Sequence, residues 1–93
     1  MASSPMITFY RRPACGLCDE GREALQAVLE ERAAAGRTPC RIEEREIDGD
    51  PDLEQRYGET IPVLAVGMDE LPLATSGWRI RTFLARTLDR GLA

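Results

Sequence analysis

The chain contains neither histidine nor lysine, so its twelve basic residues are all arginines. Without histidine the chain cannot carry out Ser–His or Cys–His catalysis, and it lacks the imidazole ligands of most catalytic zinc sites. Any chemistry must therefore use cysteine, carboxylate, arginine or tyrosine side chains.

Long apolar runs are also missing from the sequence. The uncharged stretch at residues 61–68 contains Pro62 and Gly67, and it is far shorter than the roughly 18–20 residues of a membrane helix. Residues 1–5 carry neither a basic patch nor an apolar segment, which argues against a secretory signal. We therefore expect a cytoplasmic protein with no membrane partner.

The charge balance argues against a nucleic-acid partner. The formal net charge is −4, and the arginines are interspersed with acidic residues, Arg11 and Arg12 being the only adjacent pair. Nucleic-acid binding instead draws its affinity from clustered cations. The length of 93 residues, with 43% hydrophobic and 30% charged residues, predicts a single globular domain over residues 1–93 with its core at about 6–90.

Cysteine is scarce, with only Cys15, Cys18 and Cys40. An odd and small number does not indicate a disulfide framework. A structural zinc site normally has four ligands, and one Cys-x-x-Cys with a lone cysteine cannot supply them. We therefore predict no metal site, and we expect Cys40 to be a buried structural residue.

Hydrophobic periodicity and turn residues predict an α/β fold with the order β-α-β-α-β-β-α. Strands are expected at residues 6–10, 41–47, 61–66 and 70–74. The first helix follows residues 15–18 and ends at Gly36. The second has Asp50 as its N-cap and ends at Gly58, and residues 75–77 cap the third.

The first strand, a turn and then Cys15-x-x-Cys18 at the start of a helix form a mechanistic unit. The unpaired N–H groups and the dipole of a helix N-terminus favour a thiolate, which is the nucleophile in thiol chemistry. Cys18, one helical turn further on, is placed to attack the mixed disulfide that forms on Cys15. We therefore predict that Cys15 is the attacking thiol and Cys18 the resolving thiol.

Residues 12–18, together with Thr60-Ile61-Pro62 before a later strand, resemble the glutaredoxin-like branch of the thioredoxin superfamily. The resemblance implies a four-stranded mixed sheet flanked by helices, with one parallel and two antiparallel pairings. It also implies a thiol–disulfide oxidoreductase in which Pro62 is cis and the backbone of Ile61 pairs with a substrate. Arg12 falls where many glutaredoxins place a lysine that meets a glutathione carboxylate.

The sequence departs from glutathione-binding members at residues 73–78, which contain one glycine and no acid. Those members usually have a Gly-Gly pair followed by an acid. Thr75, Ser76 and the N–H groups at the start of the last helix would therefore have to bind the second end of glutathione. We expect no bound cofactor, weak affinity for glutathione as a cosubstrate, and better turnover of a protein disulfide.

The expected partners are a disulfide-containing protein and a reductant, either glutathione or a thioredoxin-reductase-type system. Two alternatives stay open on the residues alone. The cysteine pair could bind copper(I) or share an iron–sulfur cluster across a dimer without catalysis, or it could be a redox sensor whose disulfide changes partner affinity. Trp78 either covers the edge of the sheet or docks a partner.

Overall fold

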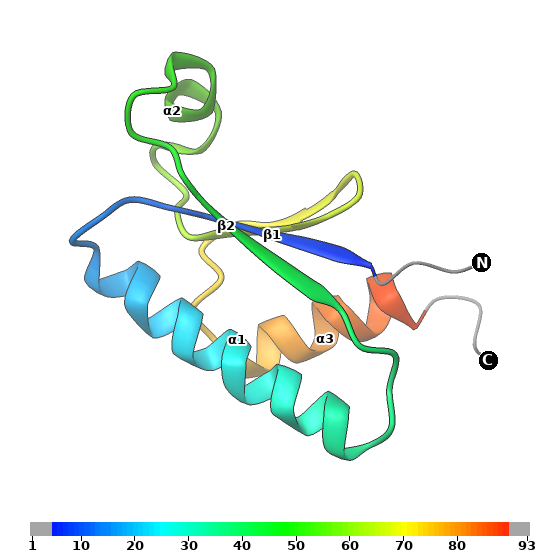
Figure 1. The fold of residues 1–93 in the computed structure, drawn as a ribbon. Helices are drawn as coiled ribbons and strands as arrows, with labels where there is room; N and C mark the ends of the chain where they lie inside the picture. Colours follow the sequence, from blue (N-terminus) through cyan, green and yellow to red (C-terminus); the bar gives the residue numbers. More distant parts are fainter. Residues whose placement is uncertain (1–4, 90–93) are drawn as a thin grey trace.

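The computed structural model describes residues 5–89, which form four strands and three helices (Figure 1). The elements are β1 (Met6–Arg11), α1 (Gly16–Ala34), β2 (Arg41–Glu46), α2 (Pro51–Tyr57), β3 (Val63–Val66), β4 (Asp69–Leu71) and α3 (Gly77–Leu88). Their order is the predicted one. No helix within residues 5–89 is long and apolar enough to cross a membrane.

The four strands form one mixed sheet in the order β2-β1-β3-β4. β1 runs parallel to β2, with Ile7 opposite Ile42, and antiparallel to β3, with Phe9 opposite Leu64. β4 continues the sheet antiparallel to β3. The α/β fold and the mixed four-stranded sheet expected from the resemblance are therefore confirmed.

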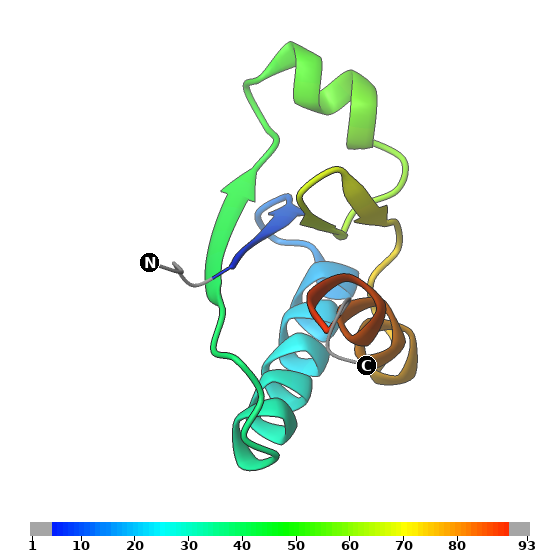
Figure 2. The same cartoon turned by 90° about the vertical axis from the view of Figure 1, so that its right-hand side faces the viewer.

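Helices α1 and α3 lie side by side on one face of the sheet (Figures 1 and 2). The main core lies between these helices and the sheet, where alternate strand residues meet the apolar stripe of each helix. Its fully or almost fully buried members are Ile7, Phe9, Leu25, Val28, Leu64, Ala74, Ile80, Phe83 and Leu84.

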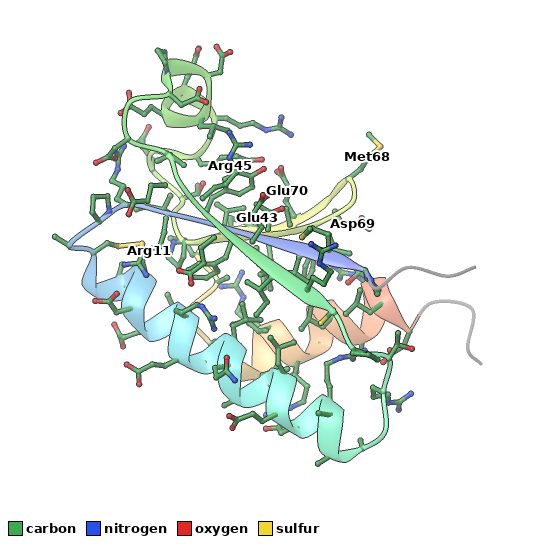
Figure 3. All side chains as sticks on the ribbon, viewed as in Figure 1. Arg11, Glu43, Arg45, Met68, Asp69 and Glu70 are labelled. Atoms are coloured by element: carbon green, nitrogen blue, oxygen red, sulfur yellow. A yellow bond between two sulfur atoms is a disulfide. The ribbon has the colours of Figure 1, made fainter. Side chains whose placement is uncertain are left out.

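Helix α2 lies on the opposite side of the sheet from α1 and α3 (Figure 2). A smaller apolar cluster of Ile47, Tyr57 and Val63 holds it there. The ring of Tyr57 stacks on that of Tyr10, with ring centroids 4.4 Å apart. Its hydroxyl donates a hydrogen bond to Glu70, which projects from β4 on the same side of the sheet (Figure 3).

Two strands differ from their predicted ranges by more than one residue at one end. β3 begins at Val63, two residues later than predicted, because Pro62 has no N–H for the ladder; its carbonyl accepts the N–H of Ala74 at 2.7 Å instead. β4 ends at Leu71, because Pro72 follows and Leu73 takes a positive φ of 51°. Residues 72–76 are therefore a connecting loop.

Candidate redox site

The cysteine pair lies where β1 ends and α1 begins. Cys15 is the N-cap of α1, and its sulfur accepts the backbone N–H of Cys18 at 3.1 Å. The two sulfur atoms form a disulfide across Cα atoms 5.2 Å apart. Cys15 is half-buried, whereas Cys18 is completely buried. The disulfide can therefore be approached from the side of Cys15.

Pro62 and the loop before α3 pack against the same helix. The Ile61–Pro62 peptide bond is cis, and Pro62 is buried. Gly21, three residues after Cys18, faces the carbonyl of Ala74 and the ring of Pro62 so closely that a Cβ atom would not fit. The structure thus places the predicted residue Pro62 against α1, the helix that begins at the cysteine pair. The half-buried Ile61 instead packs on the apolar cluster of Ile47, Tyr57 and Val63.

The Arg12 side chain, about one-third exposed, is paired with acidic side chains of its own chain. Its guanidinium forms an ion pair with Asp48 in the turn after β2, and it lies 3.8 Å from the Glu54 carboxylate on α2. The predicted carboxylate-binding arginine is thus already paired with two carboxylates of its own chain. These partners, 36 and 42 residues away, could not be found from the sequence.

Arg11 is likewise paired with acidic side chains. Its guanidinium lies 2.8 Å from Asp19 and 3.7 Å from Glu44, and Glu44 also pairs with Arg22 at 3.0 Å. Figure 3 shows Arg11 beside the first turn of α1. Arg11, Arg22, Asp19 and Glu44 therefore form one group of ion pairs, and Arg12 forms a second group with Asp48 and Glu54.

Thr75 and Ser76 lie in the connection to α3. Ser76 is the N-cap of α3, and its hydroxyl oxygen accepts the N–H of Arg79 at 3.3 Å. Thr75 donates its N–H to Leu73, and Arg79 donates to the carbonyls of Leu73 and Pro72. The Ser76 hydroxyl therefore has a structural role as a cap, which is the role that the sequence predicts.

Cys40 lies at the opposite end of the β1–β2 pair from the disulfide, and Trp78 lies in the first turn of α3. Cys40 is half-buried before β2, and burial raises the pKa of its thiol. Trp78 is 69% exposed and borders a hollow of about 160 Å³ together with Leu71 of the edge strand β4. Among residues 5–89, no group of three or more cysteine and acidic side chains is arranged to hold a metal ion.

The fold and the cysteine pair define a thioredoxin-like α/β protein with a redox-type site. The chain belongs to the family described as "Glutaredoxin-like domain (DUF836)", whose model matches residues 6–85. A search of curated proteins found no significant match.

Solved structures share the fold. The X-ray structure of the protein XcR50 from X. campestris is 37% identical to this chain, with a TM-score of 0.64, and the match covers 84% of this chain and 93% of that one. The solution structure of the same protein gives a TM-score of 0.60 at 37% identity, covering 84% and 90%. The germline-specific thioredoxin Deadhead of Drosophila melanogaster, 15% identical, shares the fold with a TM-score of 0.57 over 89% of this chain and 80% of that one.

Proposed function

We propose that the protein is a thiol–disulfide oxidoreductase that reduces protein disulfides through Cys15 and Cys18. The observation that carries the proposal is the asymmetry of the pair. Cys15 is partly exposed at the N-terminus of α1, whereas Cys18 is buried one turn further on and already bonded to it. An accessible attacking thiol beside a protected resolving thiol is the arrangement that two-step exchange needs.

The proposed exchange converts one disulfide into another. In the reduced protein, the Cys15 thiolate attacks one sulfur of the substrate disulfide, forms a mixed disulfide and releases the other substrate sulfur as a thiolate, which is protonated. The Cys18 thiolate then attacks the Cys15 sulfur and releases the second substrate thiol. The substrate gains two electrons, and the protein is left with the Cys15–Cys18 disulfide seen in the structure. A thiol reductant, glutathione or a thioredoxin-reductase-type system, restores the dithiol.

The surroundings of the pair support a protein disulfide as substrate rather than glutathione. The backbone before the cis Pro62 could pair with an extended substrate chain. By contrast, Arg12 is paired with Asp48 and Glu54, and Ser76 caps α3. These are two of the groups that glutathione would have to use. In this proposal the protein works in the cytoplasm without a bound cofactor.

Reduction of insulin disulfides tests the proposal with either reductant system as electron source. The wild type is expected to accelerate reduction, Cys15→Ser to abolish the acceleration, and Cys40→Ser to retain it. Cys18→Ser should accumulate a mixed disulfide with the substrate, because the resolving attack is lost. If Cys40→Ser loses as much activity as Cys15→Ser, or if Cys15→Ser stays active, the two-cysteine mechanism is wrong.

A further inference from the structure

The two arginines that precede the cysteine pair are both committed to carboxylates of other elements. Arg12 is held by Asp48 and Glu54. Arg11 is held by Asp19 and Glu44, and Glu44 also binds Arg22. Two carboxylates therefore face the single charge of Arg12, whereas Arg11 and Arg22 share two other carboxylates.

Because Arg12 is close in the chain to Cys15, its ion pairs with Asp48 and Glu54 can affect which substrates Cys15 attacks. Arg12 follows β1 directly and lies three residues before Cys15. Its side chain is about one-third exposed, and those of Asp48 and Glu54 are somewhat more exposed. The carboxylate of Glu54 is itself held in place, because it accepts the backbone N–H of Gly49 at 3.3 Å. The arginine is thus accessible to a ligand, but its charge is already balanced.

This balance has a direct consequence for a disulfide that approaches Cys15. A carboxylate on the substrate could bind Arg12 only by displacing Asp48 or Glu54, and it would then meet the other of these two acids at close range. A neutral or cationic disulfide meets no such repulsion. Resting on the proposed function, we infer that Asp48 and Glu54 are specificity-determining residues: by holding Arg12, they make the Cys15–Cys18 dithiol prefer neutral and cationic disulfides over anionic ones.

The expected size of the effect follows from the exposure of these groups. Ion pairs between exposed side chains contribute up to about 1 kcal/mol, which corresponds to a rate or affinity factor of roughly fivefold. Release of Arg12 should therefore raise the relative rate for an anionic disulfide about three- to fivefold. Because the interaction is exposed, added salt should reduce this gain.

Single-turnover oxidation of the pre-reduced protein measures the preference. Three symmetric aliphatic disulfides serve as probes: hydroxyethyl disulfide is neutral, cystamine is cationic and dithiodipropionate is anionic. Acid quenching and alkylation then quantify the Cys15–Cys18 disulfide formed, with each rate divided by that of a free dithiol with the same probe. The wild type is expected to react more slowly with the anionic probe than with the other two.

The variant D48N/E54Q should raise the anionic-to-neutral rate ratio about three- to fivefold. The matched control is D52N/E59Q, which likewise removes two negative charges. Both residues are exposed, lie on or next to α2, and form no ion pair within residues 5–89. The control should leave the ratio near that of the wild type. Adding Arg12→Gln to D48N/E54Q should remove the rise in the anionic-to-neutral rate ratio, because that rise depends on the charge of Arg12.

Three outcomes would overturn the inference: a wild type that shows no charge preference, an equal gain in the D52N/E59Q control, or a gain that survives Arg12→Gln. In each of these cases the dithiol still reduces the neutral probe, and the proposed function stands. A wild type that reduces none of the three probes overturns the proposed function and this inference with it.

Discussion

Gly21 of α1 lies directly against the backbone carbonyl of Ala74, with no room between them for a Cβ atom. The ring of Pro62 lies 3.0 Å from the same place that a Cβ would occupy. This contact is where the helix that carries the cysteine pair meets both the cis-proline segment and the loop into α3. The small size of residue 21 therefore sets how closely these three parts of the site approach one another.

Substitution of Gly21 by alanine should lower the stability of the fold. Alanine gains about 1 kcal/mol in helix propensity, but the new methyl group must push back a backbone carbonyl, and overpacking of this kind costs about 1–3 kcal/mol or more. We expect a net decrease in the free energy of unfolding, measured by urea denaturation. The control is Gly77→Ala on α3, where the methyl group would meet nothing within 4 Å; it should be neutral or slightly stabilising. Equal stabilities of Gly21→Ala and Gly77→Ala would contradict this account of the contact.

The three thiols of the reduced protein should differ in their rate of alkylation. Cys15 is partly exposed at a helix N-terminus, whereas Cys18 is completely buried and Cys40 is half-buried with a raised pKa. Iodoacetamide near neutral pH should therefore modify Cys15 well before the other two. Peptide mapping at short reaction times measures the order. Earlier modification of Cys18 would reverse the roles assigned to the two cysteines.

Replacement of Asp89 by asparagine should destabilise the protein near neutral pH. Asp89 caps α3 and accepts two hydrogen bonds from Arg32 of α1, a buried arginine, at 2.8 and 3.2 Å. Loss of hydrogen bonds between charged groups should cost about 1–3 kcal/mol. Denaturation at pH 7 measures the loss. The exposed pair Glu31–Arg81 provides a control between the same two helices, and Glu31→Gln should cost less.

The effect of Asp89 should also depend on pH in a defined direction. The hydrogen bonds from Arg32 hold the pKa of the Asp89 carboxyl below its ordinary value of 3.8. A lowered pKa in the folded state stabilises the fold above the ordinary value, and this stabilisation is lost as the pH falls through the folded value. The difference between the wild type and Asp89→Asn should therefore shrink below about pH 4. A difference that stays constant down to pH 2 would show that the charge of Asp89 is not its source.

Tyr57 should make the fold sensitive to alkaline pH. Burial, followed by the hydrogen bond to Glu70, raises the pKa of its hydroxyl well above the ordinary value of 10.0. A raised pKa in the folded state stabilises the fold below the ordinary value, and the stabilisation is lost as the pH rises through the folded value. The free energy of unfolding should accordingly fall above about pH 10. Tyr57→Phe should reduce the steepness of this fall while costing about 1 kcal/mol at pH 7.

The alkaline measurement needs a background without Cys40. Burial raises the pKa of that thiol above its ordinary value of 9.0, so Cys40 contributes a decline of the same sign from about pH 9. The comparison of tyrosine with phenylalanine is therefore made in Cys40→Ser protein. If the two proteins lose stability equally steeply above pH 10, Tyr57 is not the responsible group.

The local features of this protein could be predicted from the sequence because each depends on residues within one or two turns of chain. Asp50 caps α2 and accepts the N–H of Leu53 at 3.2 Å, as its place before Pro51 indicated. Gly36, directly after the C-cap Ala35, takes the positive φ of 75° that stops α1 from continuing. The position of Cys15 at the start of a helix with Cys18 one turn later was visible in the same way.

Only the tertiary structure decided which side chains meet across the fold. Arg12 and Asp48 are 36 residues apart and Arg32 and Asp89 are 57 apart, and their pairing depends on how the helices and the sheet pack. The same packing buries Arg32 within a helix that otherwise presents charged residues to solvent, and it leaves Trp78 largely exposed. Hydrophobic periodicity shows which face of an element turns inward, but a long arginine side chain can reach several acids at similar cost. The partner that it takes depends on which acidic groups the folded backbone brings within reach.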